Sequence, residues 1–265
     1  MKKGLIALAV LALFAQCATV PITGRKQLKM VNVKQLQTMS FTQYSDVKST
    51  AKLLPDSDPR TALVKKVGAN ISSAVNRYLT NNGYKDRLSE FEWEFNLAEE
   101  NTVNAWCMPG GKVMFYTGIL PICQDEAGIA VVMGHEVAHA IARHGNERMS
   151  QGMLAQGIGA LGQVGTSGAS PQVQAIFNQS FGIGSQLGLL KFSRNNESEA
   201  DKLGLVFMTM AGYDPATAAD FWKRMAANKG EGQAPPEFMS THPSDERRIT
   251  DILEYLPEAR KWENK

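Results

Sequence analysis

The stretch GIAVVMGHEVAHAIARH, residues 128–144, decides the fold expected for this chain. It is apolar on nearly every face, a pattern typical of a helix that is buried all round. Three polar side chains interrupt it, those of His135, Glu136 and His139. Buried polar groups need partners, because leaving one unpaired costs on the order of several kcal/mol. The sequence therefore predicts a polar site inside the core.

The two histidines have the spacing of zinc ligands. Positions four apart lie about 400° apart around a helix, so His135 and His139 project from one face. Two imidazole nitrogens on that face can approach one zinc ion to about 2.0–2.1 Å. Glu136 lies about 100° around the helix, beside the metal, where it can reach a water molecule. His144 is expected to be a residue near the helix C-terminus, placed favourably for the helix dipole.

A catalytic zinc site has three protein ligands and one open position, so a third ligand must come from elsewhere. The segment SRNNESEAD, residues 193–201, opens a second expected helix. Glu197 and Asp201 share one face of it, which makes Glu197 the candidate ligand and Asp201 a candidate partner for an imidazole N–H. Glu199 is expected to point away from that face and to pair with Lys202 at the surface.

A small sheet and further helices are predicted around these two segments. Asp58 followed by Pro59 is typical of a helix N-cap and first helical residue. Alternating apolar and polar residues predict the first strand, and Pro109-Gly110-Gly111 predicts a turn between the other two. The expected elements are helices at 32–54 and 59–80, strands at 91–97, 103–106 and 112–117, and helices from about residue 124 to the end.

The first sixteen residues have the features of a signal peptide. Lys2 and Lys3 precede an apolar run, residues 4–15, that is shorter than the roughly 20 residues needed to span a bilayer. The segment 14–16 before Cys17 resembles the lipobox of bacterial lipoproteins, which implies a lipid-modified Cys17. Removal of residues 1–16 would leave 26 basic and 26 acidic residues, since two of the 28 basic residues are lost. A buried N-terminal helix is the alternative.

Composition limits the remaining function classes. The 265 residues include 28 Lys and Arg against 26 Asp and Glu, a net charge of +2, which argues against a nucleic-acid partner. A hydrophobic fraction of 43% and a charged fraction of 20% are ordinary for a globular protein. Cys107 and Cys123 are expected to form one disulfide or to pack as two separate thiols.

These motifs together resemble a known enzyme family. HExxH at 135–139, followed by SRxxExxxD at 193–201, resembles the HtpX and CAAX-prenyl-protease type of zinc metallopeptidases, which are gluzincins. The segment NAWxxPGG at 104–111 is similar to the family's edge strand and turn, and STHP at 240–243 is similar to its C-terminal loop. Without multiple membrane spans, the chain is most similar to the single-domain periplasmic lipoprotein branch.

The resemblance implies an α+β, mostly helical gluzincin-type fold with a small three-stranded sheet packed on the HExxH helix. It implies that zinc is bound by His135, His139 and Glu197, that Glu136 is the general base, and that Asp201 supports a ligand from behind. The expected reaction is metal-assisted peptide hydrolysis with one zinc ion per chain, in which Glu136 takes a proton from the activated water and delivers it to the leaving amine.

Three further assignments concern substrate and transition state. Substrate is expected to lie as an extra strand beside Asn104, Ala105 and Trp106, because backbone pairing accepts many sequences. Arg194 is a candidate donor to the oxyanion, or alternatively a structural partner of a carboxylate. His242 follows a polar Gly/Pro segment expected to be a mobile loop; it is expected to cap the metal, to stabilise the oxyanion, or only to hold a turn.

The expected protein is a zinc-dependent endopeptidase of the bacterial cell envelope that hydrolyses misfolded or damaged envelope polypeptides. Its expected location is the periplasm of a Gram-negative bacterium, anchored to the outer membrane through Cys17. Residues 1–16 are the expected signal peptide, 17–58 a lipid-anchored tether with an N-terminal helix, and 59–265 the metallopeptidase domain. An envelope chaperone or assembly factor with a structural zinc is one alternative, and a small-molecule metallohydrolase such as a deacetylase is another.

Overall fold

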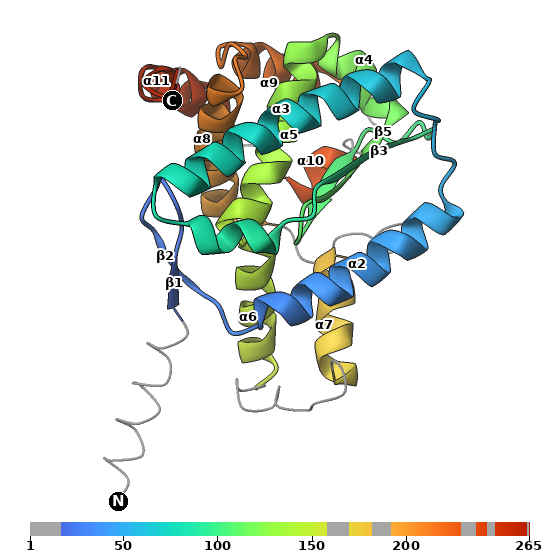
Figure 1. The fold of residues 1–265 in the computed structure, drawn as a ribbon, viewed down its shortest axis with the longest axis vertical. Helices are drawn as coiled ribbons and strands as arrows, with labels where there is room; N and C mark the ends of the chain where they lie inside the picture. Colours follow the sequence, from blue (N-terminus) through green and yellow to red (C-terminus); the bar gives the residue numbers. More distant parts are fainter. Residues whose placement is uncertain (1–16, 158–169, 182–191, 229–236, 243–246, 264) are drawn as a thin grey trace, which may run out of the picture.

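Two helices, α5 (Glu126–Ala142) and α8 (Arg194–Met210), cross at the centre of the molecule (Figure 1). The computed structural model describes residues 17–157, 170–181, 192–228, 237–242, 247–263 and 265. The crossing is close because glycines face each other: a Cβ atom on Gly204 would lie 3.0 Å from the backbone nitrogen of His135. This close approach brings the polar residues of α5 next to the first turns of α8.

A three-stranded sheet packs beside α5, as predicted for the HExxH helix. Its strands are β3 (Glu94–Ala98), β4 (Ala105–Met108) and β5 (Lys112–Tyr116), in the spatial order β3-β5-β4. The central strand β5 pairs in parallel with β3 and antiparallel with β4. In Figure 1 the sheet lies between α3 and α2. The strand β4 is thus an edge strand, and it is the strand that contacts α5.

The upstream helices begin at the residues that the sequence marks. The side chain of Asp58 accepts the backbone N–H of Arg60 at the start of α3 (Pro59–Asn81), with Pro59 in the first turn. Asn32 caps α2 (Val33–Thr50) in the same way, through the N–H groups of Lys34 and Gln35. Both helices are amphipathic, and α3 contributes its buried face to the main core against α5.

The predicted helical character from residue 124 onward is confirmed for the described residues. The remaining elements are η1 (Lys85–Glu90), η2 (Thr117–Ile119), α4 (Leu120–Cys123), α6 (His144–Ala155), α7 (Pro171–Phe181), α9 (Thr217–Ala227), α10 (Glu237–Thr241) and α11 (Arg248–Arg260). The prediction for His144 is wrong. Arg143 adopts a left-handed conformation (φ 57°) that ends α5, so His144 begins α6 instead of ending the previous helix.

The segment expected as an extended tether is folded against the domain. The strands β1 (Cys17–Thr19) and β2 (Lys26–Leu28) form an antiparallel hairpin. Between them Val20 is fully buried, and the side chain of Gln27 donates to the carbonyl of Ala142 at the end of α5, 2.6 Å away. The expected tether is therefore packed on the domain at these residues, because its side chains find partners on α5, α6 and α8.

The remaining expectations concern the signal peptide, the mobile loop, the cysteines and membrane spans. The predicted signal peptide, residues 1–16, lies outside the described residues. The predicted mobile loop before His242, residues 228–236, does so too except for Asn228. Cys107 and Cys123 carry free thiols, so the disulfide alternative is not realised. Across the described ranges, none of the helices combines the length and the apolarity that a bilayer crossing requires.

Candidate metal centre

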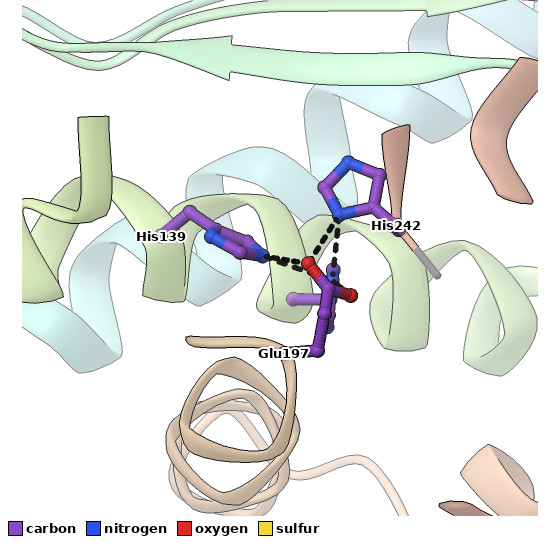
Figure 2. A group of neighbouring side chains, drawn as sticks. His139, Glu197 and His242 are labelled. Carbon is purple, nitrogen blue, oxygen red and sulfur yellow. Dashed lines mark hydrogen bonds and ion pairs between the residues drawn. The ribbon is translucent and has the colours of Figure 1, made fainter. Parts of the chain in front are cut away.

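Four side chains from three parts of the chain converge in the core. His135 and His139 come from α5, Glu197 from the first turn of α8, and His242 directly follows α10. All four are buried, and their potential ligand atoms all lie within 4.8 Å of one another. Figure 2 shows His139 and His242 directed toward the carboxylate of Glu197. Sequence reasoning placed three of these residues as metal ligands and left several roles open for His242.

The separations between the donor atoms match a tetrahedral zinc site. Bond lengths of about 2.0–2.1 Å imply that two ligand atoms on a tetrahedron lie about 3.3 Å apart. His135 Nε2 lies 3.1 Å from His139 Nε2 and 3.4 Å from Glu197 Oε2. His139 Nε2 lies 3.4 Å from Glu197 Oε1. His242 Nδ1 lies 3.3 Å from His135 Nε2 and 3.1 Å from Glu197 Oε1. The donor set therefore fits one zinc ion.

The Nδ1 atoms of His135 and His139 both contact a polar side chain outside the cluster. His135 Nδ1 lies 2.9 Å from Asp201 Oδ1, and His139 Nδ1 lies 2.9 Å from Nδ1 of His144. A partner on Nδ1 fixes the tautomer and the orientation of an imidazole that binds metal through Nε2. Both Nε2 atoms are thereby directed into the cluster, and Asp201 lies where it can support His135.

Glu136 lies beside the cluster and contributes no atom to it. Its Oε1 lies 3.4 Å from His242 Nε2 and has no hydrogen-bond partner among the described residues. Burial raises the pKa of Glu136, an effect that the nearby imidazoles and the backbone N–H of Cys107 oppose without cancelling it. A buried carboxylate with an unpaired oxygen and a raised pKa has the properties of a general base next to a metal.

Charge within the cluster is balanced between imidazoles and carboxylates. Burial lowers the pKa of His135, but hydrogen bonds to Asp201 and Glu197 outweigh burial and raise it to about 9. Burial raises the pKa of Glu197, but the three surrounding imidazoles hold it well below its usual range. Burial lowers the pKa of His139, which keeps this ring neutral. The carboxylates are therefore ionised and available to a cation.

Arg248 is a site residue that the sequence analysis missed. Its Nη1 lies 3.2 Å from Glu197 Oε2, its Nη2 donates to Asp201 Oδ1 at 2.7 Å, and its guanidinium stacks on the ring of Trp222, 3.4 Å from the centroid. Only its position shortly after the THP segment pointed to it. Arg194, the candidate donor to the oxyanion, is exposed on the first turn of α8, and it forms no hydrogen bond or ion pair with the cluster among the described residues.

Glu199 is buried instead of exposed, which corrects the expected pairing with Lys202. His144 Nε2 lies 2.9 Å from its Oε2, and Arg25 Nε donates to the same oxygen at 2.8 Å. The hydroxyl of Thr23 donates to Oε1. The N-terminal hairpin covers the face of α8 that the sequence analysis assigned to solvent, so Glu199 points into a second polar layer behind the cluster.

The three residues predicted to pair with substrate lie at the start of the edge strand β4. The side chain of Asn104 donates to Glu237 at 2.8 Å, and the carbonyl of Val103 accepts the N–H of Phe238 at 3.0 Å. Trp106 donates through its indole to Tyr116, 3.1 Å away. These contacts tie the edge of the sheet to α10, the helix that precedes His242. A pocket opens next to His139, lined in part by Cys107 and Phe192.

Comparison with known proteins gives one family and several relatives. The family described as Peptidase family M48 matches residues 65–256. The mitochondrial metalloendopeptidase OMA1 of Schizosaccharomyces pombe is 35% identical over 248 residues, which cover 93% of this chain and 68% of the relative. The same enzyme of Saccharomyces cerevisiae is 31% identical over 256 residues, covering 90% and 69%. The beta-barrel assembly-enhancing protease of Escherichia coli is 26% identical over 264 residues, covering 95% of this chain and 52% of the relative.

Proposed function

We propose, from the premise that this chain belongs to peptidase family M48 and is a zinc metalloendopeptidase, that His135, His139 and Glu197 hold its zinc and that His242 caps it at rest. The observation that carries this proposal is the set of donor separations of 3.1–3.4 Å around one point. The orientations of the two α5 histidines support it, since both rings present Nε2 to the cluster.

The residues around the metal divide the reaction between them. Zinc, when bound, acts as a Lewis acid that polarises the scissile carbonyl and the attacking water. Glu136 accepts the proton of that water on Oε1, the oxygen left without a hydrogen-bond partner in the part of the chain that the structure describes, and passes it to the leaving amine. Arg248 holds two carboxylates in place, that of Glu197 through an ion pair and that of Asp201 through a hydrogen bond, which makes it a positioning residue.

His242 is proposed as the ligand that departs when substrate binds. Four protein ligands close a zinc site, whereas catalysis requires an open position. His135, His139 and Glu197 sit on helices of 17 residues, but His242 follows the five-residue α10. The same short helix is hydrogen-bonded to the carbonyl of Val103, two residues before the edge strand begins. A polypeptide that pairs with this edge would disturb α10 and thereby release His242.

The proposed substrate is an unfolded polypeptide bound as an additional strand at β4. The edge position of β4 and its contact with α5 support this, because the added backbone would run above the zinc ligands. The pocket beside His139 is the proposed site for a side chain of such a substrate. Backbone pairing selects extended segments more than particular sequences, which suits an enzyme that removes misassembled proteins.

The proposed location is the cell envelope of a Gram-negative bacterium, where a lipid on Cys17 would anchor the protein to the outer membrane. The signal-like residues 1–16 support it, as does the exposure of Cys17 at the start of β1. The Escherichia coli relative is named for the assembly of beta-barrels, whereas the OMA1 relatives are named as mitochondrial enzymes. Cys17→Ser should leave the protein in the soluble fraction or as an uncleaved precursor; unchanged fractionation and processing would exclude the lipid.

Digestion of unfolded casein by the purified protein tests the activity. Wild type should cleave casein, a chelator should stop cleavage, and added zinc should restore it. Glu136→Gln should keep about one zinc per chain and lose activity by orders of magnitude, because the ligands remain and the base is removed. A protein that keeps its zinc but cleaves nothing, even as His242→Ala, would favour the envelope chaperone or assembly factor with a structural zinc.

A further inference from the structure

A continuous chain of polar contacts connects the N-terminal hairpin to His139. From the cluster outward, His139 Nδ1 lies 2.9 Å from His144 Nδ1, and His144 Nε2 lies 2.9 Å from Glu199 Oε2. The same carboxylate accepts from Nε of Arg25 at 2.8 Å and from the hydroxyl of Thr23. The chain thus crosses from α5 to α6, then to α8, and ends on the hairpin formed by β1 and β2.

The protons along this chain have one consistent assignment. A carboxylate only accepts, so the contact with Glu199 requires His144 to donate from Nε2. Neutral His144 then has a lone pair on Nδ1, so its contact with His139 is a hydrogen bond only if Nδ1 of His139 carries a proton. His139 must therefore carry its proton on Nδ1 and present the lone pair of Nε2 to the cluster. This is the tautomer that a metal bound at Nε2 requires.

Arg25 is the group that keeps the far end of this chain in place. Its Nη1 and Nη2 donate to the two oxygens of Glu147, both at 2.8 Å, while its Nε holds Glu199. Glu147 and Glu199 are 7% and 6% exposed, so two buried carboxylates share one guanidinium. Only a planar fork of donors can hold both at once, and removal would leave them without their cation.

We propose that Arg25 is a positioning residue of the zinc centre, which orients the ligand His139 through Glu199 and His144. This inference rests on the proposed function, because it takes His139 as a zinc ligand. His135 is supported by Asp201, on the same helix as Glu197, whereas the support of His139 ends on a hairpin more than a hundred positions away in sequence. Docking of the N-terminal hairpin is therefore a condition for firm zinc binding.

Zinc affinity, measured by competition with a chromogenic chelator on the full chain, tests the proposal. His144→Ala should weaken zinc binding about 10–100-fold, the usual effect of removing a partner of a metal-binding histidine. Arg25→Ala should weaken it about tenfold. Lys26→Ala is the matched control, because it removes the same charge from the adjacent residue of the same hairpin. The side chain of Lys26 is exposed and donates to the hydroxyl of Thr19, so this variant should bind zinc as wild type does.

A double-mutant cycle separates positioning from general loss of stability. In the His144→Ala background, Arg25→Ala should cause no further loss of zinc affinity, because the series of contacts from Arg25 to His139 is already interrupted. An equal loss in both backgrounds, or wild-type zinc affinity in Arg25→Ala, would overturn the proposal. If Arg25→Ala does not fold, Arg25→Lys takes its place in the same cycle, since it keeps the charge and loses the fork.

Failure of the ligand assignment itself gives a different result. His139→Ala should lose zinc regardless of what happens at Arg25. If His139→Ala binds zinc as tightly as wild type, the proposed ligand set is wrong. If His139→Ala loses zinc while Arg25→Ala and His144→Ala do not, the ligand set stands and the positioning role is refuted.

Discussion

Replacement of Gly204 by alanine tests whether the helix crossing sets the geometry of the metal centre. The added Cβ would lie 3.0 Å from the backbone nitrogen of His135 and 3.1 Å from the carbonyl carbon of Gly134. Ordinary contacts begin near 3.4 Å, so α8 must retreat from α5 by about 0.4 Å. Metal–ligand distances tolerate about 0.2 Å. Because Glu197 lies on α8 and the histidines on α5, the shift exceeds what the site can absorb.

Zinc affinity is the decisive readout for Gly204→Ala, because stability combines two opposing effects. Alanine favours a helix by about 1 kcal/mol over glycine, whereas overpacking costs about 1–3 kcal/mol. The net change in the free energy of unfolding should be between about zero and 2 kcal/mol destabilising. Zinc binding, measured by chelator competition, should weaken at least about tenfold, the scale of displaced ligand support.

Gly152→Ala is the control for this substitution. Its Cβ would meet only the side-chain methyl Cγ2 of Ile176, at 3.2 Å, and a side chain can move where a backbone cannot. Gly152→Ala should therefore match or exceed wild type in melting temperature and bind zinc normally. If Gly204→Ala binds zinc as tightly as Gly152→Ala does, the crossing does not control the ligand distances and the reasoning fails.

Three further predictions follow from the site. Arg248→Ala should weaken zinc binding and lower thermal stability, because it removes the guanidinium that compensates the buried carboxylates of Glu197 and Asp201. Arg194→Ala, at an exposed position, should change neither quantity. Equal effects of the two substitutions would contradict the geometry. His242→Ala should raise basal casein cleavage if it caps the metal, and a lower kcat with unchanged zinc content would instead assign it to the oxyanion. The pKa of Glu199 is lowered to about 2 in the folded protein, against about 4.5 in the unfolded chain. Its ionised form therefore stabilises the fold above pH 4.5, and this contribution is lost as the pH falls from 4.5 toward 2. Glu199→Gln should flatten this part of the pH dependence of the free energy of unfolding, measured with denaturant from pH 2 to 6.

Local sequence patterns predicted the elements that present the metal ligands. Helix geometry alone places His135 and His139, four residues apart, on one face, and it does the same for Glu197 and Asp201. Alternating residues predicted the first strand for the same reason. The Pro109-Gly110-Gly111 turn predicted the other two, although β4 begins at Ala105, two residues later than expected. Such signals operate within one element, where the period of the backbone fixes which side chains lie together.

The second polar layer could not be predicted from such patterns. Arg25 and Arg248 contact the site across more than a hundred and about fifty positions respectively, and nothing in either local sequence marks that contact. Glu199 was assigned to solvent because a helix was assumed to bury one face, whereas the hairpin covers a second. The end of α5 depends on a left-handed Arg143, a conformation usually marked by glycine.

Anomalous diffraction at the zinc absorption edge, from crystals of the zinc-loaded protein, tests the assignment of the metal centre most directly. It locates the metal independently of activity and of any variant. We expect one strong peak per chain, about 2.0–2.2 Å from Nε2 of His135, from Nε2 of His139 and from a carboxylate oxygen of Glu197. A peak bounded by other residues, or none at this cluster in protein that cleaves casein, would contradict the account.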